Sequence, residues 1–284
     1  MPILMVVLAA IIWGMIGPLT HIFIYSPVLN SAVRFIVPGL VLYGYFALKN
    51  KKWMWFRYSP KMTAISLLNI VRVGTFFLAM SLAPISYIIF FLYLWPIFAM
   101  FLAVPILKEK LTFFGLGMGI LAFLGSVIMQ VPYGFHWNSM LMWAGLIMTV
   151  SAFTNALSVV MITVERARYS PMEIIFYQNG FGTVAGILYL LITRPNLGGF
   201  DIAYLTGYGF VIGIVSFYLY YGALGKIDTK LALILTYVEL IVAFLLGITL
   251  LHEKIHYISL IGGGIIAITV GVTLLNQQRP KVEI

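Results

Sequence analysis

Residues 93–110 read YLWPIFAMFLAVPILKEK, and residues 237–254, which begin 144 positions further along the chain, read YVELIVAFLLGITLLHEK. Seven of the 18 aligned positions are identical without a gap. The same offset aligns Ser26-Pro27 with Ser170-Pro171. Each pair suits the start of a helix, because serine caps the first turn and proline fits within it. The sequence therefore predicts two related halves.

The composition predicts a membrane protein. Of the 284 residues, 62% are hydrophobic and 9% are charged, whereas a soluble domain is about 45–50% apolar and about 25% charged. A helix that spans the bilayer needs about 20 apolar residues, and ten such segments fill nearly the whole chain. We expect an all-α membrane protein whose ten transmembrane helices lie at about 3–24, 28–48, 62–80, 85–107, 112–131, 139–163, 172–192, 202–223, 229–251 and 257–275.

The halves fall at residues 1–135 and 136–284, with five helices each. Because five is an odd number, the second half enters the membrane from the side opposite to the first. The fold class is therefore an inverted 5+5 repeat, embedded in the membrane as one unit. Inverted repeats are typical of secondary transporters that bind their substrate near the membrane midplane. Channels also contain them, so a channel is an alternative.

The basic residues predict the orientation. With the N-terminus inside, 13 of the 17 lysines and arginines lie in inner loops and only Arg194 and Lys254 lie in outer ones. Basic residues collect on the cytoplasmic side, so we expect both termini in the cytoplasm. The same bias accounts for the net charge of +9 without a nucleic-acid partner. The short loops favour a prokaryotic plasma membrane, and the bilayer is the surrounding partner.

A set of short motifs, in a fixed order on the two halves, resembles the drug/metabolite transporter superfamily, in its EamA-like branch of ten-helix carriers. The motifs are Trp13-Gly14, Arg34, Leu94-Trp95-Pro96, Glu109-Lys110-Leu111, Glu239 and Glu253-Lys254-Ile255. One position departs from the family, which often has Glu-Pro in the ninth helix where this chain has Glu239-Leu240. The resemblance implies a carrier of small solutes, commonly an exporter of amino acids, amphiphilic metabolites or drugs.

Three ionisable side chains fall inside predicted helices, namely Arg34, Arg72 and Glu239. Such residues are costly in a membrane and are functional candidates for that reason. Arg72 and Glu239 each lie ten residues from the inner end of their helix, so we expect both near the midplane. Arg72 can clamp a carboxylate through its planar fork. Glu239 can bind an ammonium group or take up the coupling proton, since desolvation disfavours its charged form. Alternatively, one of the arginines pairs with Glu239 only to satisfy buried charge, and Arg34, nearer the outer surface, has the more structural role.

Further site candidates share the expected depth of Glu239 or lie in helices beside it. They could hold an aromatic or cationic solute, or they could only pack between helices. Offset pairing matches Tyr93 with Tyr237, Trp95 with Glu239, and Phe77 with Tyr221. The complete set of predicted substrate-binding residues is Trp13, Arg72, Phe77, Tyr93, Trp95, Asn155, Tyr221, Tyr237 and Glu239.

Residues 252–256 match the zinc-protease pattern H-E-x-x-H, in which two histidines on one helix face hold zinc and the glutamate activates water. An intramembrane metalloprotease is therefore a second alternative. The motif falls at a predicted turn, however, and its equivalent in the first half, residues 108–112, has no histidine. We expect no catalytic residue, no metal and no cofactor, and the oligomeric state stays open.

The expected function is thus secondary transport of a small organic solute by alternating access, driven either by the solute's own gradient or by proton exchange through Glu239. The solute is amino-acid-like or cationic, and the expected direction is export.

Overall fold

The computed structural model describes residues 1–22, 25–49, 59–83, 85–110, 112–133, 139–252 and 256–277, and these residues form helices without a strand. The elements are α1 (Pro2–Gly14), α2 (Ile16–Ile22), α3 (Pro27–Leu48), α4 (Pro60–Leu82), α5 (Ile85–Leu92), α6 (Trp95–Leu107), α7 (Phe113–Gln130), the 3₁₀ turn η2 (Val131–Tyr133), α8 (Ser139–Glu165), α9 (Pro171–Thr193), α10 (Gly199–Phe210), the π-helical segment η3 (Val211–Val215), α11 (Ser216–Ala223), α12 (Thr229–Leu235), α13 (Val238–Leu251) and α14 (Tyr257–Gln277).

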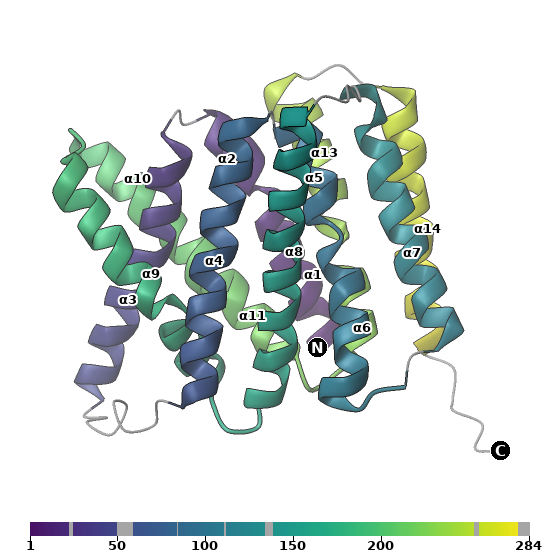
Figure 1. Ribbon diagram of the computed structural model, residues 1–284, viewed down its shortest axis with the longest axis horizontal. Helices are drawn as coiled ribbons and strands as arrows, with labels where there is room; N and C mark the ends of the chain where they lie inside the picture. The colour runs from purple at the N-terminus through teal and green to yellow at the C-terminus, as the bar shows by residue number, and fades with distance from the viewer. Residues whose placement is uncertain are drawn as a thin grey trace.

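Ten segments in the described part of the chain are long and apolar enough to cross a membrane. They stand across the bundle and alternate in direction (Figure 1). Their bounds agree with the expected ranges to within a few residues. The prediction of an all-α membrane protein with ten spanning helices is confirmed.

Several spans are interrupted, although the sequence suggested continuous helices. The first span breaks at Met15, the fourth at Tyr93-Leu94 and the ninth at Thr236-Tyr237. The eighth span passes through η3, a turn of π-helix. The interruptions of the fourth and ninth spans fall at nearly the same place in the repeat.

The two halves are packed into each other rather than placed side by side. α1 contacts α11 and α13, and α8 contacts α4 and α6. α3 also packs on α9, and α7 packs on α14. The last contact is close, because a Cβ atom added at Gly262 would lie 2.5 Å from the carbonyl oxygen of Gly125. The core therefore lies between the halves.

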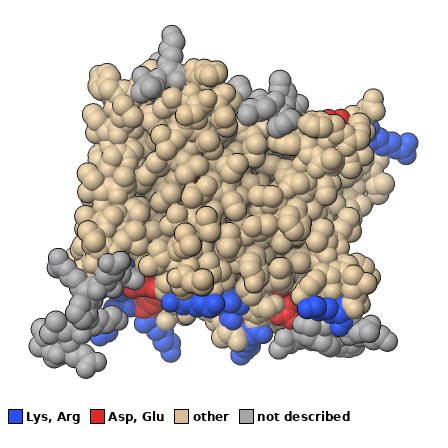
Figure 2. Space-filling view, turned by 180° about the vertical axis from the view of Figure 1, so that it is seen from behind, with Lys and Arg blue, Asp and Glu red and all other residues tan. Residues whose placement is uncertain are grey.

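The described charges gather at the two ends of the bundle. One end holds eight of the described lysines and arginines, against Arg194 at the other, if Arg34 and Arg72 inside the helices are set aside. Figure 2 shows this charged rim along its lower edge, a second charged group at the upper right, and a broad uncharged belt between. Lys61 and Glu165 pair within the rim at 3.4 Å. Such a belt is what a bilayer's hydrocarbon layer requires.

Both predicted serine caps are present. The Ser26 hydroxyl accepts a hydrogen bond from the Leu29 amide at 3.1 Å. The Ser170 hydroxyl accepts one from the Glu173 amide, and the Glu173 carboxylate accepts one from the Ser170 amide at 2.8 Å, which completes a capping box. The repeated serine-proline pairs therefore start α3 and α9 in the same way.

A side-chain hydrogen bond and a stacked pair of rings join the halves at the less charged end. The Tyr25 hydroxyl donates to the Asp201 carboxylate at 2.5 Å, and the Tyr25 ring stacks on Tyr204 with centroids 5.6 Å apart. This hydrogen bond raises the pKa of Tyr25 to about 12. The Tyr25 hydroxyl therefore stays protonated, and able to donate this hydrogen bond, throughout the physiological pH range.

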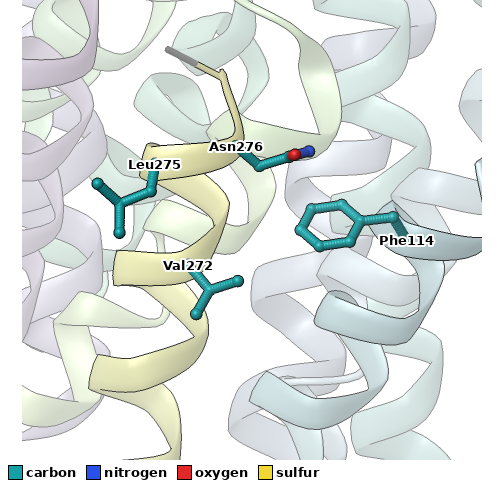
Figure 3. Close-up of a pocket in the computed structure, with 4 residues that line it drawn as sticks. All are labelled: Phe114, Val272, Leu275 and Asn276. Atoms are coloured by element: carbon teal, nitrogen blue, oxygen red, sulfur yellow. The ribbon is translucent and has the colours of Figure 1, made fainter. Parts of the chain in front are cut away.

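A cavity of about 280 Å³ lies between α7 and α14, lined by Phe114, Val272, Leu275 and Asn276. Figure 3 shows Phe114 and Asn276 pointing toward each other across it. It lies at the charged end of the bundle, between the first turn of α7 and the last turns of α14. Its walls are uncharged, so we place the solute site elsewhere.

Candidate functional site

The two broken helices meet in the interior of the bundle. The Tyr237 hydroxyl donates to the carbonyl oxygen of Tyr93 at 2.9 Å, and the two ring centroids are 6.0 Å apart. The two residues occupy equivalent positions of the repeat, 144 residues apart. Because α6 and α13 begin beside this contact, two helix N-termini lie there, each with a partial positive charge. Broken helices of this kind form the binding sites of many secondary transporters.

The two breaks have different chemical causes. Pro96 has no backbone N–H, so it cannot continue the hydrogen-bonding pattern from α5 into α6. The ninth span has no proline here, and instead the amides of Thr236, Tyr237, Glu239 and Leu240 bond to carbonyls three residues back. The Thr236 hydroxyl also donates to the Leu233 carbonyl at 2.6 Å. The ninth span thus breaks without the Glu-Pro pair common in the family that the sequence resembles.

Glu239 lies in the first turn of α13 and is half-buried. Its carboxylate is within hydrogen-bonding reach of the Tyr93 hydroxyl, and the charge of Arg34 acts on it. A carboxylate in the first turn is stabilised by the helix dipole. Among the described residues, Glu239 forms no ion pair with either Arg34 or Arg72.

Arg72 is half-buried in α4. Its guanidinium group is hydrogen-bonded to a neutral side-chain amide, that of Asn69. Its Nε and Nη2 atoms donate to the Asn69 side-chain oxygen at 3.2 and 2.8 Å. Asn69 in turn donates to the Gln178 carbonyl of α9 at 3.2 Å. The Arg72 carbonyl accepts a hydrogen bond from Ser151 of α8 at 2.8 Å. These contacts orient the guanidinium group and leave its charge unneutralised.

Arg34 lies in α3 beside an aromatic ring of α11. Its guanidinium carbon is 5.6 Å from the centroid of the Phe217 ring. Pro38 follows one turn later and cannot donate to the Arg34 carbonyl. η3 packs tightly here, since a Cβ atom at Gly213 would lie 2.5 Å from Pro38 and 2.9 Å from the Arg34 carbonyl oxygen. Turns of π-helix occur frequently at functional sites.

Trp13 and Tyr221 connect to the same region. The Trp13 ring nitrogen donates to the Ser216 hydroxyl at 2.9 Å, and the Trp13 ring lies 5.4 Å from Phe217. The Tyr221 hydroxyl donates to the Gln178 side-chain oxygen at 2.5 Å.

Three other predicted residues are less closely connected. Trp95 is buried beside the break in the fourth span, and Asn155 is half-buried in α8. The Phe77 ring packs edge-on against the Phe76 ring, with centroids 5.6 Å apart. In the described part of the chain, no hydrogen bond or ring contact joins these three residues to the other predicted site residues.

The zinc-protease pattern does not form the helix face that its chemistry needs. Residues 253–255, including Glu253, lie outside the described residues. His252 is the C-cap of α13 in a left-handed conformation, with φ of 55°, and His256 directly precedes α14. Two histidines at a helix end and beyond it do not share one helix face, as the motif requires. Among the described residues, no three histidines, aspartates or glutamates are grouped to hold a metal.

Replacing Tyr237 by phenylalanine is expected to destabilise the protein by about 1–3 kcal/mol, because the buried Tyr93 carbonyl loses its donor. Thermal unfolding in detergent measures the loss. The control is Tyr257→Phe at a side chain that is 74% exposed, which should change little. Equal unfolding temperatures for the two variants would contradict the role of this contact.

Comparison with known proteins identifies the family. Residues 1–131 and 142–276 match the EamA-like transporter family. An uncharacterized transporter from Archaeoglobus fulgidus is 25% identical over 208 residues, which cover 72% of this chain and 73% of the relative. A solved crystal structure shares the fold, with a TM-score of 0.79 and 17% identity over 95% of this chain and 96% of its own. The chain belongs to the EamA-like transporter family and is a membrane protein that transports solutes.

Proposed function

We propose that this protein is a secondary transporter that moves a small organic solute through the bundle by alternating access. The observation that carries the proposal is the meeting of the two helix breaks at Tyr93 and Tyr237, beside Glu239. Helix ends in the bundle interior provide polar groups where a continuous apolar helix has none. The proposed solute site is bounded by α6 and α13, and Arg72 on α4 and Trp13 on α1 are further proposed members of it.

The packing of the halves supports the proposal of alternating access. Each half contributes a broken helix and a first helix that contacts the other half. Two related halves can exchange their packings, and the exchange turns a cavity open to one side into a cavity open to the other. The breaks give α6 and α13 freedom to tilt independently of α5 and α12.

Glu239 is the proposed site of proton coupling. It is the acidic residue that lies nearest the two breaks in the described part of the chain, and a tyrosine hydroxyl faces it. Protonation removes its charge, so the loaded and empty sites can differ by one proton. The proposed direction is export from the cytoplasm of a prokaryotic cell, with both termini inside, in keeping with the charged rim.

Reconstitution into liposomes tests this function. Radiolabelled amino acids, amines and organic cations are screened one by one for uptake into liposomes that contain the purified protein. A transporter gives saturable, solute-specific flux that unlabelled solute on the opposite side accelerates. Ion currents without such counterflow would contradict alternating access and favour a channel. Protein-free liposomes are the control for leakage.

A further inference from the structure

Both arginines of the interior lack an acidic partner. Among the described residues, no aspartate or glutamate forms an ion pair with Arg34 or Arg72. The Arg72 guanidinium group donates to the neutral Asn69 side chain, and the Arg34 guanidinium group lies over the Phe217 ring. Charges inside a membrane are normally paired or functional. With Glu239 ionised, the site still carries one unneutralised positive charge.

The arginines lie on either side of a single connected group of side chains. From Arg72 the contacts run through Asn69 to the Gln178 carbonyl, and the Gln178 side chain accepts a hydrogen bond from Tyr221. The Tyr221 ring is 5.3 Å from Phe217, over which Arg34 lies. Both arginines are half-buried residues.

A second observation lies one turn from Arg34. Asn30 is only 4% exposed, yet neither its side-chain nitrogen nor its oxygen has a hydrogen-bond partner. Residues four apart share one face of a helix, so Asn30 and Arg34 lie together on α3. Buried amides are nearly always hydrogen-bonded in folded proteins. An unsatisfied amide beside an unpaired guanidinium group indicates a place where a polar group of a ligand binds.

The two arginines have neutral counterparts in the second half of the repeat. The position equivalent to Arg34 in the second half is Gln178, and the position equivalent to Arg72 is Ser216, each 144 residues later. Both neutral side chains accept a hydrogen bond at their positions, Gln178 from Tyr221 and Ser216 from Trp13. The first half therefore carries two positive charges at positions where the second half is built with neutral side chains.

We propose that Arg34 and Arg72 together bind an anionic group of the transported solute, a carboxylate or a phosphate. The proposal deepens the transport function proposed above and rests on it. Arginine suits this task because its planar fork binds such oxyanions through two parallel hydrogen bonds. A monoanion neutralises the site when Glu239 is ionised. A solute whose only charge is positive meets two unneutralised guanidinium groups and is rejected.

Binding to the purified protein tests the proposal with four probes that share a phenyl group and differ in the head group. The probes are 3-phenylpropionate, phenyl phosphate, 3-phenylpropionamide and 3-phenylpropylamine, and a second series carries the same head groups on a propyl chain. Isothermal titration in nanodiscs should show binding of a carboxylate or phosphate probe and none of the amide or amine. The stronger of the two anions identifies the head group.

Arg34→Gln and Arg72→Gln should each weaken binding of the anionic probe by about tenfold to a hundredfold, the usual loss for a hydrogen bond to a charged group. Arg34→Lys keeps the charge and should lose less. Arg194→Gln, at an exposed C-cap of α9, is the matched control and should bind as the wild type does. Thermal unfolding without probe verifies that each variant is folded.

The inference is overturned if the amine or amide binds as tightly as the anions, if both glutamine variants retain wild-type affinity, or if no anionic probe binds. The same probes in liposomes separate it from the transport proposal. Anions that bind to the protein but never cross the liposome membrane would contradict the transport proposal and support the anion site. Flux of the amine without flux of the anions would support the transport proposal and contradict the anion site.

Discussion

Glu239→Gln is expected to abolish solute accumulation driven by a pH gradient. A gradient of about one pH unit is worth about 1.4 kcal/mol per proton, which supports about a tenfold solute gradient at one proton per solute. Glutamine resembles the protonated glutamate in shape, but it cannot release a proton. The variant should therefore bring the solute to equal concentrations on both sides and no further. Uptake of labelled solute into liposomes with an imposed pH gradient measures the effect.

Glu239→Asp is the matched control for this experiment, because it keeps a carboxyl group in the first turn of α13. It should restore a measurable part of the accumulation. Exchange of labelled for unlabelled solute without a pH gradient should persist in both variants. Undiminished uphill transport in Glu239→Gln would rule out this residue as the coupling site.

Gly262→Ala is expected to destabilise the protein by about 2–3 kcal/mol, an overpacking cost typical of a well-filled interface. The added Cβ atom would lie 2.5 Å from the Gly125 carbonyl oxygen and 2.6 Å from the Met129 amide nitrogen. Both are backbone atoms, so no side chain can rotate away, and α7 and α14 must separate. A lower unfolding temperature in detergent measures the change.

Gly264→Ala on the same helix is the control, because nothing lies within 4 Å of its added Cβ atom. Alanine favours a helix over glycine by about 1 kcal/mol, so this variant should be as stable as the wild type or slightly more so. The two substitutions are chemically identical and differ only in their surroundings. Equal unfolding temperatures would show that the α7–α14 contact is looser than described.

The helices and the contact between the repeats could be predicted from the sequence. Apolar segments of spanning length gave the ten helices, and the constant offset paired Tyr93 with Tyr237, which touch in the structure. Such a contact is expected where equivalent positions of two inverted repeats meet in the interior of a bundle.

The detailed geometry of the site could not be predicted in the same way. The break in the ninth span depends on hydrogen bonds around Thr236 rather than on a proline, and hydrophobic periodicity carries no trace of them. The surroundings of Arg34 could not be predicted either, because its contact with the Phe217 ring joins elements that are far apart in the chain. That contact depends on how α3 packs against η3, which leads into α11.

The interlocked packing of the halves has a consequence for how the protein is made. As the chain leaves the ribosome, α1 enters the membrane long before α11 and α13, its partners in the finished bundle, have been synthesised. Until then, the polar Trp13 ring nitrogen has no Ser216 to bind. The first five helices therefore lie in the bilayer without these partners until the second half has been synthesised. Completion of the bundle is a late event in biosynthesis, and a chain terminated at its midpoint lacks the partners that close its core.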